Sequence, residues 1–191
     1  MIWPLSARRH NADMSLTIRS VLPDDSVSIE EVRIAGWRVA YRGLLPDALL
    51  DGMEVRPQLV EARANAMKDG RLKGHVAVRD GAVRGFTLYG DSRDDDIPGM
   101  EVYAIYILPE DFSTGMGRAL MDASTAAMVA AGGTEVGLWV LTDNARGRRF
   151  YERYGFTPSG RTKVDEDDGV RLEELHLRMA LPPSSGVRAG A

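Results

Sequence analysis

The sequence of 191 residues contains no cysteine. This absence excludes disulfide bonds, thiolate metal sites and a covalent acyl intermediate on a cysteine side chain. The chain also lacks an apolar run that approaches the roughly 20 residues of a membrane-spanning helix, and its opening segment, MIWPLSARRHNAD, lacks the apolar core of a signal peptide. We therefore expect a protein of the reducing cytoplasm that has no membrane partner.

Histidine is scarce, and positive charge is outnumbered by negative charge. The 24 Lys and Arg residues are outnumbered by 28 Asp and Glu residues, which leaves a formal net charge of -4. Because binding a polyanion needs a basic face, we expect no nucleic-acid partner. The histidines, His10, His75 and His176, stand singly with no HExxH spacing, so we expect no metal. A Gly-x-Ser-x-Gly motif is missing too, and with it the nucleophile of a hydrolase triad.

The composition is that of a folded globular domain. Apolar residues make up 44% and charged residues 27% of the chain, and the length suits one domain with short extensions. The first strand-like run begins directly after Met14, and the closing run PPSSGVRAGA has little to bury. We therefore predict an N-terminal extension over 1–13, a domain over 14–181 and a disordered tail over 182–191.

Two hydrophobic periods recur along the chain. A period of two predicts strands, and apolar residues at three- and four-residue spacing predict helices. Asp80-Gly81 fits the positive φ angles of a type I′ hairpin turn, and the acidic run DEDDG predicts the turn of a second hairpin. Strands are expected at 16–21, 76–79, 82–90, 100–108 and 135–141 and on both sides of the acidic run; helices are expected at 26–43, 46–50, 55–67, 115–131 and 144–153. This order predicts a mixed α/β (α+β) layer and not a strictly alternating parallel fold.

The segment 105–120, IYILPEDFSTGMGRAL, has the features of an anion site. A strand ends at a proline, and a short loop leads into a helix that opens with Gly-Met-Gly. The first turn of a helix offers unpaired N–H groups and the positive end of the helix dipole, so a phosphate can bind there. Glycines in this position are also found where they serve only a turn or a helix contact. Three side chains add hydroxyl donors or charge: Ser113, Thr114 and Arg118.

Two other phosphate-binding loops do not fit the sequence. A dinucleotide-binding fingerprint needs a third glycine where Leu120 stands. A P-loop needs Lys and then Ser or Thr after its second glycine, but the glycines at 132–137 are followed by Leu138. A nucleotide-binding protein that uses the same helix start stays open as a further alternative.

A second segment, 144–156, reads NARGRRFYERYGF. Together the two segments resemble the GNAT acetyltransferase family. The first is similar to its strand, proline, Gln/Arg-x-x-Gly-x-Gly/Ala loop and helix, and the second to its block of Asn, Phe-Tyr-Glu and Gly-Phe. The element order over 16–179 resembles the whole family fold. The resemblance implies a GNAT-like acyl-CoA N-acyltransferase fold: a central, mixed, mostly antiparallel sheet, splayed between its fourth and fifth strands, with helices on both faces.

The same resemblance implies an acetyl-CoA site where the strand at 101–108 diverges from the strand at 135–141. Asn144 would contact the cofactor arm, although it also suits a helix cap. Phe112 departs from the family pattern, which usually has Gln or Arg at this position. Backbone groups of Ile105, Tyr106 and Ile107 would bind the pantetheine arm, and the diphosphate would lie over the amides of Phe112, Ser113, Thr114, Gly115, Met116, Gly117 and Arg118.

The catalytic residues implied by the resemblance are Tyr151 as general acid and Glu101 as base. A phenol with a pKa of about 10 is protonated at neutral pH and can protonate a departing thiolate. An alkyl ammonium with a pKa of about 10.4 must lose a proton before it attacks, through a base or a water relay. Glu101 also fits a solvent-facing carboxylate at a strand start.

The acceptor is less well defined by the sequence. The stretch WRVAYRGLLP places Trp37 and Tyr41 four residues apart and resembles the first helix of a GNAT subgroup, where it borders the acceptor cleft; core aromatics have the same spacing. The acidic groups 94–96 and 165–168 suit a cationic amine, and equally suit solvated loops. We expect direct acetyl transfer from acetyl-CoA to a primary amine of a small molecule or a peptide. A non-catalytic acyl-CoA sensor is the alternative, and a homodimer is compatible with either.

Overall fold

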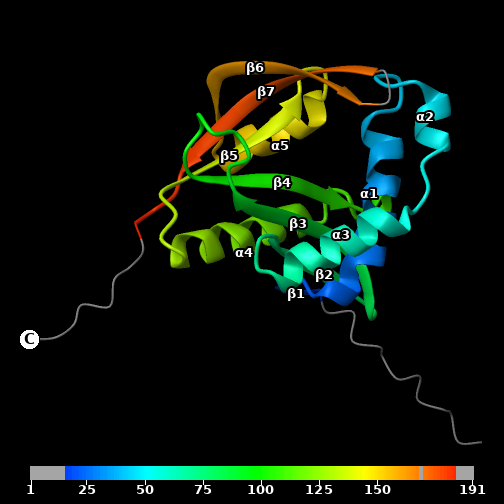
Figure 1. Ribbon diagram of the computed structural model, residues 1–191, viewed down its shortest axis with the longest axis horizontal. Helices are drawn as coiled ribbons and strands as arrows, with labels where there is room; N and C mark the ends of the chain where they lie inside the picture. Colours follow the sequence, from blue (N-terminus) through cyan, green and yellow to red (C-terminus); the bar gives the residue numbers. More distant parts are fainter. Residues whose placement is uncertain (1–15, 168–169, 184–191) are drawn as a thin grey trace, which may run out of the picture.

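A computed structural model describes residues 16–167 and 170–183 of the chain (Figure 1). The predicted extension over 1–13 lies outside the described residues, as does the predicted tail from residue 184 onward.

The described strands form one sheet in the order β1-β2-β3-β4-β5-β7-β6 (Figure 1). Neighbouring strands are antiparallel except β4 and β5, which are parallel. The predicted mixed, mostly antiparallel sheet is therefore confirmed. The strands are β1 Thr17–Ser20, β2 Lys73–Arg79, β3 Ala82–Asp91, β4 Met100–Ile107, β5 Glu135–Leu141, β6 Thr157–Asp167 and β7 Val170–Ala180.

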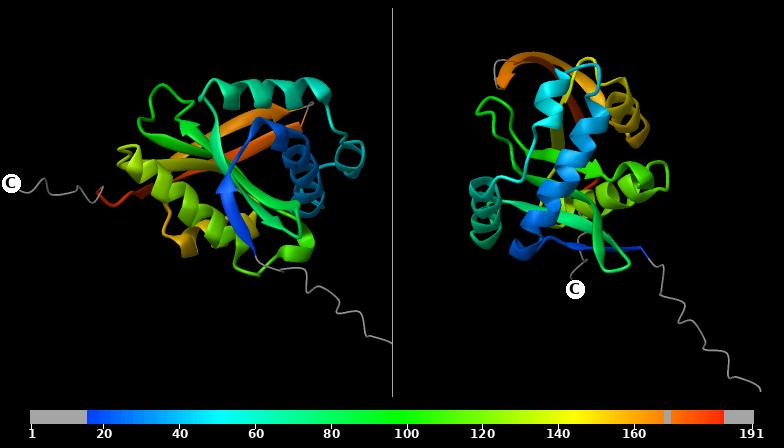
Figure 2. Two further views of the ribbon diagram at one scale, coloured as in Figure 1. Left: turned by 90° about the horizontal axis from the view of Figure 1, so that it is seen from below. Right: turned by 90° about the vertical axis from the view of Figure 1, so that its right-hand side faces the viewer.

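Helices cover both faces of the sheet, as predicted (Figure 2). The two views show α1 and α3 on one side and α4 and α5 on the other. The expected helices all form, with limits that differ by three residues or fewer. No helix in the described part of the chain is long and apolar enough to cross a membrane. The helices are α1 Ser26–Ala40, α2 Asp47–Asp51, α3 Pro57–Lys68, α4 Met116–Ala130 and α5 Ala145–Tyr154, with short 3-10 turns η1 at Pro23–Asp25 and η2 at Pro109–Asp111.

Local signals set several of these limits. Asp80 and Gly81 both have positive φ, at 53° and 76°, as a type I′ turn between β2 and β3 requires. Gly115 precedes α4 with φ 87°, a left-handed conformation that glycine adopts without steric penalty. Asn144 caps α5, because its Oδ1 accepts a hydrogen bond from the Gly147 N–H at 2.9 Å.

The prediction of a hairpin turn over the whole acidic run DEDDG, 165–169, is wrong in its extent. The first three residues of the acidic run belong to β6, where Asp165 pairs with Leu172 and Asp167 with Val170. Pairing with β7 overrides the preference of Asp for turns, because strand propensity depends strongly on tertiary context. Residues 168 and 169 of that run lie outside the described part.

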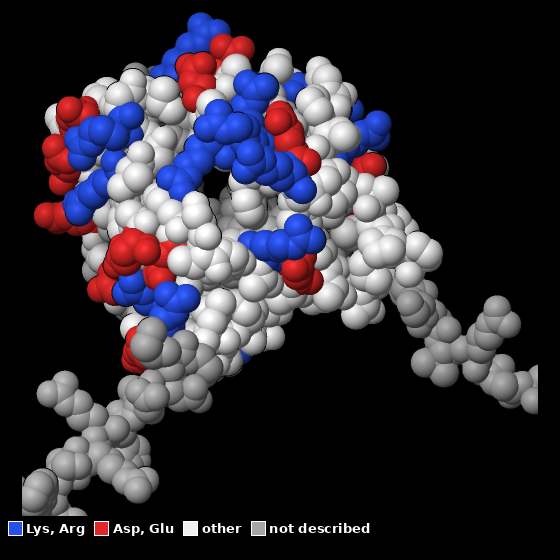
Figure 3. All heavy atoms as spheres, turned by 180° about the vertical axis from the view of Figure 1, so that it is seen from behind, with Lys and Arg blue, Asp and Glu red and all other residues white. Residues whose placement is uncertain are grey.

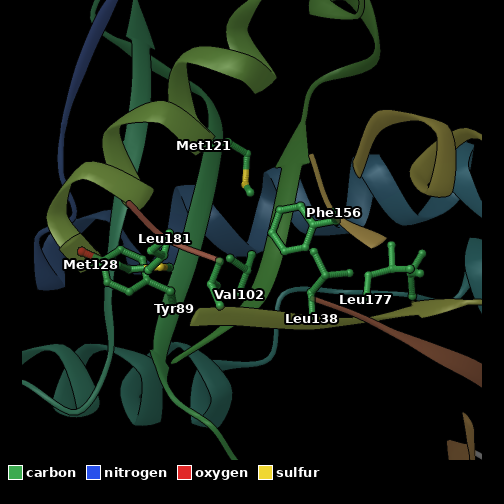
Figure 4. Packing of buried hydrophobic residues seen from close by; sticks show 10 residues of the cluster. Tyr89, Val102, Met121, Met128, Leu138, Phe156, Leu177 and Leu181 are labelled. Carbon is green, nitrogen blue, oxygen red and sulfur yellow. The ribbon is translucent and has the colours of Figure 1, made fainter. Parts of the chain in front are cut away.

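The main hydrophobic core lies between the sheet and the helices α4 and α5. Figure 4 shows side chains from α4, β3, β4, β5 and β7 meeting in this layer. Its buried members are Tyr89, Val102, Met121, Met128, Val136, Leu138, Val140, Phe156, Leu177 and Leu181. A second core on the opposite face packs Ile29 and Val32 of α1 against β2 and β3. Both faces of the sheet are therefore held against helices near the point where β4 and β5 separate.

A buried carboxylate joins α1 to α3. Glu30 is fully buried, and its carboxylate accepts hydrogen bonds from Arg33 at 2.6 and 3.0 Å and from Arg63 of α3 at 2.7 Å. Burial opposes the charged form of Glu30, but the two arginines outweigh it, so the pKa of the carboxyl lies below its usual value. The cluster positions α1, which carries Trp37.

Glu30→Gln should lower the free energy of unfolding by about 3 kcal/mol, near the lower end for breaking a buried ion pair, because both arginines keep some contact with water. The lowered pKa of Glu30 means that its contribution is complete above about pH 5 and disappears as pH falls through the folded-state value. Urea unfolding at pH 7 and at pH 3 measures both effects, and the difference in stability between the two proteins should be smaller at the lower pH.

The matched control is Arg42→Ala, which removes an exposed ion pair with Asp47 and Asp51. This change should lower stability by less than about 1 kcal/mol. Equal losses in the two variants at pH 7 would contradict a structural role for Glu30.

Candidate active site

The strands β4 and β5 separate after a short stretch of pairing. Met100 pairs with Val136 and Glu101 with Gly137, and the parallel pairing ends there. On its other side β4 stays paired with β3 as far as Ile107. The predicted splay between the fourth and fifth strands is therefore confirmed. The backbone edge of β4 that faces β5 has no strand partner beyond Glu101, and it includes Ile105, Tyr106 and Ile107.

A bulge in β4 directs its side chains around the splay. The pairing between β3 and β4 shifts by one residue, which leaves Tyr103 without a partner in β3. A bulge bends its strand and increases the local twist. Beyond it, Tyr106 packs on the α1 side of the sheet, whereas Ile105 and Ile107 pack on the α4 side.

The loop after β4 is anchored by a buried acid. Asp111 is 3% exposed, and its carboxylate pairs with Arg79 of β2 and, at 2.7 Å, with Arg84 of β3. The hydroxyl of Thr114 donates a hydrogen bond to the Asp111 carbonyl at 2.7 Å. Ser113, at φ 63°, and the following residues then turn the chain into α4. The geometry of the loop thus rests on the sheet below it, and the Thr114 proton is used to hold the loop.

The start of α4 packs tightly beneath this loop. A Cβ added at Gly117 would lie 3.0 Å from Ile107 Cδ1 and 3.3 Å from Phe150 of α5. Glycine at this position therefore lets the helix start approach both the open edge of β4 and helix α5. The predicted anion site stands next to the splay as a consequence.

Three tyrosines from separate elements meet at the splay. The hydroxyls of Tyr41, which follows α1, and Tyr106 of β4 lie 3.3 Å apart. Tyr151 of α5 interacts electrostatically with both. Burial raises the pKa of Tyr151 well above its usual value, and the neighbouring phenol of Tyr41 adds to the shift. Burial likewise raises the pKa of Tyr41, against smaller opposing contributions that include hydrogen bonding to Asn144.

The candidate base Glu101 is buried at 3% exposure, so it is not the solvent-facing carboxylate that its sequence position also allowed. It accepts hydrogen bonds from the backbone N–H of Arg93 at 3.0 Å and from the Arg93 guanidinium. It stands at the last pair before β4 and β5 diverge. The structure thus places Glu101 at the apex of the splay, with its charge balanced by an arginine from the loop between β3 and β4.

The sequence pattern missed His176, which is buried beside this apex. Its ring lies 5.0 Å from the ring of Trp139, and its Nδ1 is 2.9 Å from the hydroxyl of Ser159. Burial lowers the pKa of His176, although the charge of Glu101 acts in the opposite direction. Strand alternation placed this residue on the polar side of β7. The loop between β3 and β4 covers that side, which no local pattern could reveal.

The candidate acceptor residues lie on the α1 face. Trp37 and Tyr41 make an edge-to-face contact with ring centroids 4.8 Å apart, and Arg33 lies 5.3 Å from the Trp37 ring. Tyr41 is also part of a small core with Leu45 and Leu50, and Trp37 packs against that core, so both aromatics serve local packing as well. A pocket of about 260 Å³ opens beside them, lined by Arg33, Trp37, Leu49, Gly52, Met53, Glu54 and Arg56.

The acidic group 94–96 has partners within the protein. Asp94 accepts a hydrogen bond from the Trp139 indole at 2.7 Å, and Asp96 pairs with Arg161. These contacts attach the loop between β3 and β4 to β5 and β6. Two of the three carboxylates that were candidates for attracting an amine therefore hold this loop in place.

Comparison with known proteins agrees with this geometry. The model of the Acetyltransferase (GNAT) family matches residues 37–156, more than half of the chain. The chain belongs to this family. It is 30% identical over 170 residues to the uncharacterized N-acetyltransferase YuaI of Bacillus subtilis, an alignment that covers 85% of this chain and 91% of YuaI.

Solved GNAT structures share the fold at low sequence identity. PaiA N-acetyltransferase from Thermoplasma acidophilum, solved in complex with coenzyme A, superposes with a TM-score of 0.69 at 20% identity, over 87% of this chain and 99% of PaiA. YncA from Salmonella typhimurium, solved with acetyl-CoA, gives a TM-score of 0.66 at 20% identity, over 92% of this chain and 99% of YncA. The GNAT fold of this chain is thus found in proteins that bind the coenzyme.

Asp111→Asn should destabilise the protein, because it leaves Arg79 and Arg84 without their buried counter-charge. Both arginines are partly exposed, so we expect a loss of about 2–3 kcal/mol, less than for a fully buried pair. For a domain of this size that loss corresponds to a melting temperature lower by about 5–10 °C. Thermal unfolding followed by circular dichroism measures it.

Glu110→Gln provides the comparison, since Glu110 pairs with the same Arg84 from an exposed position. Its loss should be below about 1 kcal/mol. If both variants had the melting temperature of the wild-type protein, the stability of the loop would not depend on the Asp111 anchor.

Proposed function

We propose that this GNAT protein transfers an acetyl group from acetyl-CoA to a primary amine of a small molecule or a peptide. One observation supports the proposal most directly: the unpaired edge of β4 ends at an anchored loop with a helix start, while the Tyr151 phenol lies at the same splay. These three features suit the amide-bearing arm, the diphosphate and the leaving sulfur of a thioester coenzyme. The coenzyme complexes of PaiA and YncA support the choice of cofactor.

In this proposal the coenzyme binds chiefly through backbone groups. The pantetheine amides pair with the free edge of β4 at Ile105, Tyr106 and Ile107, in the manner of an added strand. The diphosphate lies over the N–H groups from Phe112 to Arg118, where the helix dipole favours an anion. Asn144 caps α5 through its Oδ1.

The reaction is a direct displacement. The neutral amine nitrogen attacks the thioester carbonyl carbon, a C–N bond forms, and the C–S bond breaks. The departing sulfur takes a proton from the Tyr151 hydroxyl, and the amine nitrogen gives up a proton to the base. The products are an acetylated amine and coenzyme A, and no acyl group becomes attached to the protein.

Burial suits Tyr151 to the role of acid. Its raised pKa keeps the phenol protonated throughout the physiological pH range. A free thiol has a pKa of about 8.5, so transfer from a phenol of higher pKa is unfavourable in water. The same burial raises the pKa of the departing sulfur, because desolvation disfavours every anion in the splay. The match between donor and acceptor therefore depends on the coenzyme filling the site.

Glu101 is the base in this proposal, either directly or through a water molecule. It lies on the α1 face of the sheet, at the apex where an amine from the acceptor side would meet the thioester. Arg93 balances its charge, and Arg93 itself is 58% exposed at its side chain, so it can move without unpacking the core. Trp37 and Tyr41 line the approach from α1.

Tyr151→Phe should lower kcat by roughly 10²- to 10⁴-fold, the usual contribution of a general acid, and leave the Kd for acetyl-CoA within about twofold. Thiol release with a panel of amines measures kcat, and calorimetry measures the Kd. A non-catalytic acyl-CoA sensor predicts affinity without turnover in the wild-type protein as well.

The matched control is Tyr154→Phe, one turn further along α5. The Tyr154 hydroxyl donates to Asp122 of α4 at 2.8 Å, away from the splay. The Tyr154→Phe substitution should change kcat by less than about threefold. Equal losses in both variants would contradict a chemical role for Tyr151.

With an alkyl amine as acceptor, kcat/KM should rise from pH 6 to about 10, because such an amine becomes nucleophilic only as it loses its proton near pH 10.4. The raised pKa of Tyr151 keeps the acid protonated across this range, so no alkaline decline is expected below about pH 10. Initial rates in buffers of constant ionic strength provide the measurement. A decline centred near pH 8 would rule out a buried phenol as the acid.

A further inference from the structure

An arginine of α5 stacks on the loop that follows β4. The guanidinium carbon of Arg146 lies 3.6 Å from the centroid of the Phe112 ring. Phe112 stands in the loop that precedes α4 and is partly buried, whereas Arg146 is exposed in the first turn of α5. The contact joins the two segments from which the coenzyme site is built.

The charge of Arg146 is not neutralised by the protein. Among the side chains that the structure describes, no carboxylate forms a salt bridge with it. The other cations near the loop are already engaged: Arg79 and Arg84 pair with Asp111, and Arg118 lies 3.7 Å from Asp122. Arg146 is therefore a cation that contacts this loop and remains available to an external anion.

Without a bound anion, a positive charge at the position of Arg146 is unfavourable. The first turn of α5 contains no acidic residue, and the positive end of a helix dipole repels a guanidinium. Seen from behind, the molecule shows Lys and Arg side chains around a hollow in its surface (Figure 3). An anion bound at the start of α5 would relieve the repulsion and pair with the charge of Arg146.

We propose that Arg146, held over the Phe112 ring, binds a phosphate group of coenzyme A. The inference rests on the proposed function and assigns to it a residue that the sequence motifs did not. A stacked guanidinium keeps its N–H donors in the plane of the group, directed outward, where they can hold two phosphate oxygens together. Phe112 has no charge of its own, but its ring thereby positions the guanidinium of Arg146 beside the loop.

The test is calorimetric titration of the full chain with coenzyme A. Arg146→Ala should raise the Kd by about tenfold, as expected for the loss of a charge-assisted bidentate contact at a partly exposed site. Phe112→Leu, which keeps the charge and removes the platform, should raise it by about threefold. The melting temperature of Arg146→Ala should stay near wild type, because Arg146 is exposed and forms no salt bridge among the described residues; the melting temperature of Phe112→Leu is measured alongside to confirm that this variant is folded.

Arg153→Ala is the matched control. Arg153 follows Arg146 by nearly two helical turns, on the same face of α5 and about 10 Å further along. The Arg153→Ala substitution removes the same charge from the same helix and should change the Kd by less than threefold. Equal effects of Arg146→Ala and Arg153→Ala would show only general attraction and would overturn the proposal.

A second titration series with 3′-dephospho-coenzyme A identifies the phosphate. If Arg146→Ala weakens both ligands alike, the diphosphate is the partner; if it weakens coenzyme A alone, the 3′-phosphate is. Both results support the proposal, and an unchanged Kd for both ligands refutes it. If the wild-type protein binds neither ligand, the proposed function itself fails, which is a different outcome.

Discussion

The structure depends on the early end of pairing between β4 and β5. A sheet normally satisfies the backbone groups of its internal strands, so an internal strand with a free edge is a costly arrangement unless something else pairs with it. Here β4 keeps β3 on one side and loses β5 beyond Glu101. The bulge at Tyr103 bends the strand, and α4 and α5 hold the two diverging halves from one face. A ligand with amide groups along its length is the natural partner for such an edge.

Buried carboxylates fix the parts of the protein that surround this edge. Glu30 ties α1 to α3, Glu101 holds the loop between β3 and β4, and Asp111 anchors the loop before α4. Each is almost fully buried, and each is paired with arginines that keep partial contact with water. Such pairs add little net stability compared with apolar packing, but they are specific in geometry, because an unpaired buried charge is strongly unfavourable. They therefore determine where elements lie more than how firmly the chain folds.

The chemistry expected at the splay follows from the convergence of separate elements in one buried region. Tyr41, Tyr106 and Tyr151 come from the end of α1, from β4 and from α5, and burial raises the pKa of each. Phenols kept protonated in this way can donate hydrogen bonds and protons but cannot act as bases at neutral pH. Glu101, the carboxylate at the apex of the splay, lies on β4, whereas Tyr151 lies on α5.

The amino-acid sequence by itself determined which elements form and several of their ends, because these depend on neighbours within a few residues: the hydrophobic periods, the Asp80-Gly81 turn, the glycine before α4 and the Asn144 cap. Its two motifs were also sufficient to predict the GNAT fold and the splay. Only the tertiary structure decided that β7 lies between β5 and β6, that His176 is buried, that Glu101 is paired with Arg93, and that Arg146 stacks on Phe112. Each of these joins residues from different elements, where packing and charge pairing outweigh local preference. For the same reason the acidic run at 165–167 became strand, although its composition favours a turn.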